Sequence, residues 1–378
     1  MVINVKLSRR ILLKSAAAQA LLLPALSAPA WAAQADILQN YLLCAKNAEG
    51  EYVAVKITED GQIKQQFTLA DRGHGHAKSP TGGLAIFARR PNNQLYLIDE
   101  TGKMRLLYAP EDRHFFGHGV FSPDGKLLYT SENDFDNEDY EATGVIGIWD
   151  VKHGKKIGEF SSAGIGVHQI MLMADGETLV IANGGILTHP DHPRQKLNLA
   201  DMQPNLAFVN RKNGQLISKV NLPAELHQLS IRHIDITTRG LAAIAMQYQG
   251  GLAEDVPLIA TVGQTQPLKF VQAPQNLIKR HKQYVGSICF DKSGKFFAAS
   301  SPRGNIVSFY TKTGQFLSLY AMNDVCAVAA APAPYQFILA SGMGEIDLYD
   351  LGQKTAISLH TQSAKTELYQ WDNHMLAL

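Results

Sequence analysis

From residue 35 onward, short runs of β-branched and aromatic residues alternate with tight polar turns. Most of these turns contain glycine, as in SPDGK from 122, MADGE from 173, DKSGK from 291 and TKTGQ from 311. Turns of this kind are typical of β-hairpins, because glycine readily adopts positive φ angles. The spacing of an amphipathic helix is nearly absent. The pattern therefore predicts many short antiparallel strands.

These strands recur in larger units. Residues 117–160 and residues 284–320 share one order of apolar runs and turns, and residues 166–220 repeat it with a longer insertion. Each unit gives four strands in about 40 residues, which is the spacing of a β-propeller blade. The innermost strands are expected to start near 76, 118, 168, 233, 286, 326 and 367. We therefore predict an all-β fold, a seven-bladed β-propeller with four antiparallel strands per blade.

The two ends of the repeating region complement each other. The C-terminal segment KTELYQWDNHMLAL, residues 365–378, supplies one strand of a blade, and residues 41–70 supply the others. Pairing between them closes the ring and leaves few free strand edges. We expect residues 33–378 to form a single propeller domain.

The first 32 residues have the pattern of an export signal. Ser8-Arg9-Arg10 precedes an apolar run from 16 to 26 and a small-residue cleavage site at 30–32. The paired arginines resemble a twin-arginine signal, with an ordinary secretion signal as the alternative. No later segment approaches the roughly 18 apolar residues of a membrane span. We expect a soluble periplasmic protein.

Composition and charge narrow the possible functions. Hydrophobic residues make up 46% of the chain and charged residues 18%, and the formal net charge is +1. No overall field favours nucleic acid, and we expect no nucleic-acid partner. The motifs GxSxG, HExxH, the P-loop and CxxC are absent, so the usual serine hydrolase, zincin, nucleotide and thioredoxin-type sites are not encoded. A binding site must therefore be local.

Histidines gather at the predicted starts of the innermost strands. In a propeller these strands line the central channel and start at the same mouth. The candidate metal ligands are His76, His118, His168 and His233. Neutral imidazole is a common ligand of Zn, Cu and Fe, so the set predicts a convergent metal or anion site. The alternative is that these histidines are packed or capping residues.

Further polar residues are expected at the same mouth, where second strands end. They are candidates for binding a ligand or cofactor: Glu132, Asn133, Asp134, Asn183, Arg232 and Arg303. The last two are cationic, and Arg232 directly precedes His233. The opposite end of the ring consists of ordinary hairpin turns.

Several motifs together carry a family resemblance. They include RHFFGHGVFSPDGKLLYTSENDF, GIGVHQIML, ANGGILTHPD, HQLSIRHIDI and SPRGNIV. In this order they resemble the bacterial domain-of-unknown-function family 1513, over essentially the whole chain after the signal. The resemblance implies a WD40/YncE-like periplasmic propeller exported by the twin-arginine pathway. It also implies a role in iron or transition-metal handling, beside imelysin-like or di-haem proteins, and no defined catalytic residue.

Two functions remain open at this stage. The favoured one is a non-catalytic, monomeric binding protein that holds a transition metal (Cu, Fe or Zn) or a metal-carrying partner at the histidine-rich mouth. The alternative is a metal-dependent enzyme, either a lactonase-like hydrolase or a redox protein with His-ligated copper or iron. An enzyme needs an acid or base beside the metal, for which Glu132 and Asp134 are the candidates.

Overall fold

The computed structural model describes residues 38–90, 92–136, 143–192, 195–251, 253–359 and 369–378. Residues 39–378 belong to one compact unit. The predicted signal segment, 1–32, lies outside the described residues. No helix among the described residues is long and apolar enough to cross a membrane.

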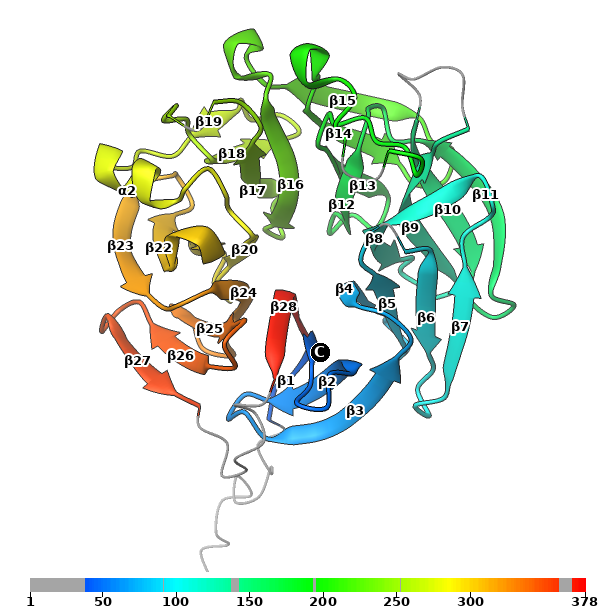
Figure 1. The fold of residues 1–378 in the computed structure, drawn as a ribbon, viewed down its shortest axis with the longest axis horizontal. Helices are drawn as coiled ribbons and strands as arrows, with labels where there is room; N and C mark the ends of the chain where they lie inside the picture. Colours follow the sequence, from blue (N-terminus) through cyan, green and yellow to red (C-terminus); the bar gives the residue numbers. More distant parts are fainter. Residues whose placement is uncertain (1–37, 91, 137–142, 193–194, 252, 360–368) are drawn as a thin grey trace, which may run out of the picture. The chain divides into compact units, whose positions relative to one another are not determined.

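Seven four-stranded antiparallel sheets are arranged in a ring (Figure 1). Blade 1 has the order β28 (Gln370–Ala377), β1 (Asn40–Lys46), β2 (Tyr52–Thr58) and β3 (Ile63–Leu69) from the centre outward. Blade 2 contains β4 (Gly73–Lys78), β5 (Leu84–Ala88), β6 (Gln94–Ile98) and β7 (Met104–Tyr108). Blade 3 contains β8 (Arg113–Phe121), β9 (Leu127–Asp134), β10 (Gly144–Asp150) and β11 (Lys155–Ser161).

The remaining blades follow the same order from the innermost strand outward. Blade 4 contains β12 (Val167–Leu172), β13 (Thr178–Asn183), β14 (Asn205–Asn210) and β15 (Leu216–Asn221). Blade 5 contains β16 (Leu229–Ile236), β17 (Leu241–Tyr248), β18 (Ile259–Gly263) and β19 (Lys269–Phe270). Blade 6 contains β20 (Ser287–Phe290), β21 (Phe296–Ser301), β22 (Ile306–Thr311) and β23 (Phe316–Ala321). Blade 7 contains β24 (Val325–Ala330), β25 (Gln336–Ser341), β26 (Ile346–Asp350) and β27 (Thr355–Ser358).

The predicted fold class is confirmed. The described residues contain seven blades of four antiparallel strands and very little helix. The helical segments are short: α2 (Gln275–Arg280) and the 3₁₀ turns η2 (Leu199–Asp201), η3 (Ala224–Leu226) and η4 (Pro302–Gly304). The hairpin glycines behave as the turn chemistry requires, since Gly125, Gly176 and Gly294 have φ between 63° and 69°.

The core lies between neighbouring blades rather than at the centre of the ring. Separate clusters of buried side chains join blades 2 and 3, blades 3 and 4, blades 6 and 7, and the other adjacent pairs. Each innermost strand also contacts the innermost strands of both neighbours, which closes the circle around a narrow channel. Side chains that these strands direct inward are therefore brought close together.

The ring closes within blade 1. β28 pairs with β1 in antiparallel register, from Tyr41 opposite Ala377 to Lys46 opposite Gln370. As a result, the innermost strand of blade 1 comes from the C-terminal part of the chain and the other three come from its N-terminal part, as the colours in Figure 1 show.

Candidate metal centre

Five consecutive innermost strands each direct one imidazole into the channel. We call this set the histidine cluster; it consists of His374 (β28), His74 (β4), His118 (β8), His168 (β12) and His233 (β16). Going around the ring, the centroids of neighbouring imidazoles lie 4.6, 5.1, 4.7, 4.9 and 4.5 Å apart. His118 and His374 are also only 4.8 Å apart, so the five rings form a compact cluster.

The ring nitrogens of the cluster converge. Two overlapping triads each offer three nitrogen atoms within 4.8 Å of one another: His74, His118 and His374, and His118, His168 and His233. In a tetrahedral zinc site with bonds of about 2.0–2.1 Å, ligand nitrogens lie roughly 3.3 Å apart. Small side-chain rotations would close that difference. His118 belongs to both triads and is the central ligand candidate.

Every member of the cluster also has a buried ring nitrogen without a hydrogen-bond partner. These atoms are Nδ1 of His74, His168 and His233, and Nε2 of His118 and His374. Buried polar atoms are nearly always paired in folded proteins, so five orphaned nitrogens in one place need an explanation. His114 and His281 also have one unpaired ring nitrogen each, but neither belongs to a triad.

The cluster is held in its neutral form. Burial, and then the positive charge of neighbouring histidines, lowers the pKa of His118, His168, His233 and His374 well below the usual value. Burial also lowers the pKa of His74, although Asp372 opposes this. A neutral imidazole has a free nitrogen lone pair, which is the form that binds metal.

Asp372 provides a carboxylate beside the cluster. Its Oδ1 lies 3.6 Å from Nδ1 of His74, slightly beyond hydrogen-bond distance, and its other oxygen pairs with Arg72. Burial alone would raise the pKa of Asp372. The contact with His74 and the charge of Arg72 lower the pKa by more than burial raises it, so this carboxyl is ionised. If His74 binds an ion through Nε2, Asp372 lies at its other ring nitrogen, where a carboxylate commonly orients a metal ligand.

Irregular strand pairing aims the five side chains. The register between the innermost strand and its partner shifts in all five blades, next to His74, His118, His168, His233 and His374. A β-bulge of this kind bends the strand and re-aims one side chain. The five histidines therefore do not follow the simple two-residue alternation of a flat strand.

Glycines make room for two of the rings. A Cβ atom on Gly75 would lie 2.7 Å from Nδ1 of His118, and one on Gly117 would lie 2.7 Å from Cδ2 of His74. Gly117 also has φ of +89°, which other residues rarely adopt. The segments GHGH and FGHG thus allow His74 and His118 to interlock across the boundary between blades 2 and 3.

The structure places three of the four proposed metal ligands in the cluster, namely His118, His168 and His233. His76 lies apart from it, with Nε2 3.2 Å from Sγ of Cys44 on the neighbouring blade. Burial lowers the pKa of His76 to about 3. The position in β4 that contributes to the cluster is His74, two residues earlier.

Two members of the cluster, His74 and His374, are not among the metal ligands proposed from the sequence, although the segment RGHGHAKS places His74 at the same strand entrance as His76. The bulge in β4 conceals which of its two histidines faces the channel. His374 could have been found from its strand, because QWDNHMLA places histidine fifth in the innermost strand, as LSIRHIDI does for His233.

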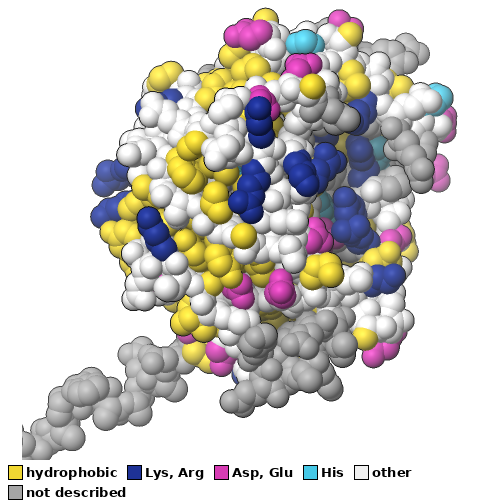
Figure 2. Space-filling model, turned by 60° about the vertical axis from the view of Figure 1, so that its left-hand side comes forward, with side chains coloured by type: hydrophobic (Ala, Val, Ile, Leu, Met, Phe, Trp, Pro, Cys, Tyr) yellow, Lys and Arg dark blue, Asp and Glu magenta, His cyan; other side chains and the backbone are white. Residues whose placement is uncertain are grey.

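A cavity of about 290 Å³ opens beside the cluster at the mouth of the channel. His74, His168 and His233 form part of its wall. Its other lining residues are Arg89, Arg90, Phe116, Arg232, Gln247, Tyr284 and Asn373. In Figure 2, Lys and Arg side chains surround a recess on the right of the view, in which histidine is visible. We call this cavity the mouth pocket.

The two cationic candidates belong to this region. Arg232 lines the mouth pocket directly, and its Nε is buried without a partner. Arg303 is exposed and lies over the ring of Tyr284, with 4.6 Å between its guanidinium carbon and the ring centroid. Tyr284 itself lines the pocket.

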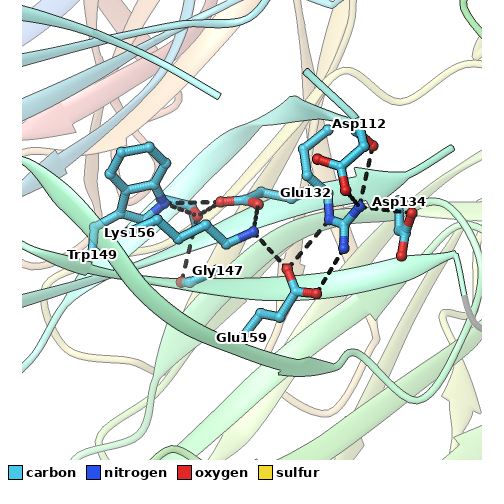
Figure 3. A network of polar contacts seen from close by, with 9 residues as sticks. Asp112, Glu132, Asp134, Gly147, Trp149, Lys156 and Glu159 are labelled. Carbon is cyan, nitrogen blue, oxygen red and sulfur yellow. Dashed lines mark hydrogen bonds and ion pairs between the residues drawn. The ribbon is translucent and has the colours of Figure 1, made fainter. Parts of the chain in front are cut away.

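Glu132 and Asp134 belong to an ion-pair network within blade 3 (Figure 3). The buried carboxylate of Glu132 accepts hydrogen bonds from Nε1 of Trp149 at 2.9 Å and Nζ of Lys156 at 2.7 Å. Asp134 pairs with Arg113 at 2.7 Å, and Arg113 also binds Glu159 at 2.7 Å. All of these partners lie on β8, β10 and β11, so both carboxylates are committed to holding the blade together.

The two asparagine candidates, like the two carboxylates, are hydrogen-bonded to other residues of the protein. Asn133 donates to the carbonyl of Thr188 at 3.3 Å. Asn183 donates to the carbonyl of Ser162 at 2.8 Å and to Oδ1 of Asn205 at 2.9 Å. Both fix loops near the mouth.

Comparison with known proteins identifies the family. A search of curated proteins found no match. The family described as "Protein of unknown function (DUF1513)" matches residues 67–378, which include all five members of the histidine cluster. The chain therefore belongs to this family of β-propellers, the one that its sequence motifs resemble.

Proposed function

We propose that the histidine cluster binds a transition-metal ion and that the protein is a non-catalytic metal-binding propeller. The observation that carries this proposal is the gathering of five buried imidazoles from five separate blades, which form two overlapping nitrogen triads and each have an unpartnered ring nitrogen. A packed structural histidine uses its ring nitrogens in hydrogen bonds, whereas each ring of the cluster has a buried nitrogen without such a bond.

The energetics favour an occupant for the cluster. Leaving a buried polar atom unpaired costs about 1–3 kcal/mol. Five such atoms in one place destabilise the folded state unless something binds them, and a cation accepts several lone pairs at once. An all-nitrogen ligand set suits Zn, Cu or Fe rather than Ca or Mg, which prefer oxygen.

The alternative of a metal-dependent enzyme has less support. The candidates for its acid or base are Glu132 and Asp134, and both carboxylates form ion pairs in the network of blade 3. Among the described residues, the mouth pocket has no carboxylate in its lining. The proposal is therefore for binding rather than catalysis.

The place and partners of this function are also proposals. The twin-arginine pattern at residues 8–14 supports export to the periplasm in a folded state. The family resemblance supports a role in iron or transition-metal handling, with an imelysin-like or di-haem protein as the partner that gives or receives the ion.

Removing His118 should abolish tight metal binding, because both triads depend on it. We expect His118→Ala to lower the affinity for Zn²⁺ or Cu²⁺ at least tenfold, measured by competition with a chromogenic chelator and by elemental analysis of the purified protein. His168→Ala removes a ligand of one triad only and should lower the affinity less. His153→Ala is the matched control, since this side chain is 62% exposed on a hairpin turn of blade 3.

Circular dichroism and thermal unfolding of each variant check the fold. If both cluster variants keep the metal affinity of the unaltered protein while their folds persist, the metal-binding proposal fails.

A further inference from the structure

The mouth pocket carries an excess of positive charge. Arg89 and Arg90 follow β5, and Arg232 lies on β16, so two blades direct three guanidinium groups toward one cavity. Arg303 extends the positive charge over Tyr284 at the rim. The whole chain has a formal net charge of only +1, so this concentration of positive charge is local.

None of these four arginines forms an ion pair with a carboxylate among the described residues. The ion-paired arginines in this part of the chain are Arg72 and Arg113. Arg90 donates to Oγ1 of Thr188 at 3.1 Å, which is a neutral partner.

Arg232 is the most unusual member of the set. It occupies the bulge of β16, between the paired residues Ile231 and His233. Its Nε is buried and has no hydrogen-bond partner. A buried cation without a counter-charge is strongly unfavourable, and an anion in contact with it removes much of that penalty. The bulge therefore directs this partly buried guanidinium, with its unpartnered Nε, toward the pocket that the cluster histidines line.

Guanidinium groups match one class of ligand especially well. Their planar donors bind carboxylate and phosphate oxygens in pairs, with both charge and geometry matched. Gln247 and Asn373 add neutral amides to the wall, and the cavity of about 290 Å³ suits a small molecule.

We propose that the mouth pocket is a binding site for a small oxyanion with two or more negative charges, of the polycarboxylate or phosphate class. Arg232 is its central contact, and Arg89 and Arg90 complete the positive wall. This site is distinct from the metal site in its chemistry, and it exists whether or not the histidine cluster holds an ion.

Calorimetric titration of the purified, metal-free protein tests the site with two probes, citrate and inorganic phosphate. We expect at least one of them to bind with a dissociation constant below 1 mM at low salt, and to bind more weakly as ionic strength rises. Binding of citrate alone identifies a polycarboxylate site, binding of phosphate alone identifies a phosphate site, and binding of both identifies a general oxyanion site.

Arg232→Met should lower the affinity for the bound anion at least tenfold. Arg239→Met is the matched control, because Arg239 is exposed on the turn between β16 and β17, away from the mouth pocket. The thermal stability of Arg232→Met in anion-free buffer separates binding from structure: loss of a partly buried charge that has no ion pair should leave the melting temperature unchanged or raise it.

The variant His118→Ala keeps the two proposals separable. It should lose metal affinity but retain anion binding in the metal-free state. The oxyanion proposal is overturned if neither probe binds up to 10 mM, or if Arg232→Met binds as tightly as the unaltered protein.

Discussion

At the scale of single residues, the chemistry of the channel depends on keeping imidazoles neutral. Burial removes water from the five rings of the histidine cluster, and each ring also raises the cost of charging the next. The same environment that prepares these nitrogens for a metal makes them sensitive to acid when no metal is bound.

The metal-free protein should lose stability as the pH falls below about 6.5. In the unfolded chain these histidines take up protons near their usual pKa of about 6.5, whereas in the folded state their pKa is lowered. The unfolded state then binds more protons, so the free energy of unfolding decreases with falling pH by up to about 1.4 kcal/mol per pH unit for each histidine.

Urea unfolding at pH 7, 6 and 5 in the presence of a chelator measures this effect. His168→Gln should reduce the slope between pH 6 and 5 by about 1 kcal/mol per pH unit. His153→Gln removes an exposed histidine for comparison. Equal slopes for the unaltered protein and His168→Gln would show that the cluster does not resist protonation.

At the scale of strands, the site depends on five β-bulges. Sequence periodicity predicted the strands, the blades and the innermost positions, because hairpin glycines and apolar runs are local signals. It could not tell which histidine of β4 faces the channel, because a bulge shifts the alternation of side chains without leaving a clear trace in the sequence. The bulge in β4 is why His74 rather than His76 joins the cluster. Glu132 lies on a regular part of β9 and contacts Lys156 on β11 instead of the mouth.

Gly117 should be the most sensitive backbone position of the site. Gly117→Ala brings a Cβ to 2.7 Å from His74 and forces an alanine to adopt φ of +89°. We expect a loss of about 1–3 kcal/mol of stability together with at least a tenfold loss of metal affinity.

Gly82→Ala separates the two effects. Gly82 has a similar φ of +96°, but the nearest atom to an added Cβ is 3.7 Å away, on Glu100. Its stability should fall by roughly 1 kcal/mol with unchanged metal affinity, measured by urea unfolding and chelator competition. If the two alanine variants bind metal equally well, the interlocking of His74 and His118 does not matter for the site.

At the scale of the whole molecule, stability depends on the pairing of β28 with β1 in blade 1, which we call the joint. Trp371 on β28 is buried against blade 7, stacks on Tyr369 with 4.9 Å between ring centroids, and donates to the carbonyl of Gly344 at 3.2 Å. These contacts hold the strand that completes the ring. The blades themselves are open sheets whose apolar faces only a neighbour can cover.

Trp371→Ala should therefore lower the free energy of unfolding by about 3–5 kcal/mol. Urea unfolding followed by far-ultraviolet circular dichroism measures the loss. Tyr108→Ala, at a side chain 55% exposed on an outermost strand, should change stability by less than about 1 kcal/mol. A cost for Trp371→Ala as small as that of Tyr108→Ala would mean that the ring does not rely on this joint.

The joint in blade 1 also sets the order of events during synthesis. β28 follows every other described strand in the sequence, yet it supplies His374 to one of the two nitrogen triads. That triad cannot exist on a growing chain; it forms only when the ring has closed. An ion bound there would link β28 to β4 and β8, and would favour the closed ring over any state in which β28 has detached. Occupancy of this triad would thus report that the molecule has finished folding.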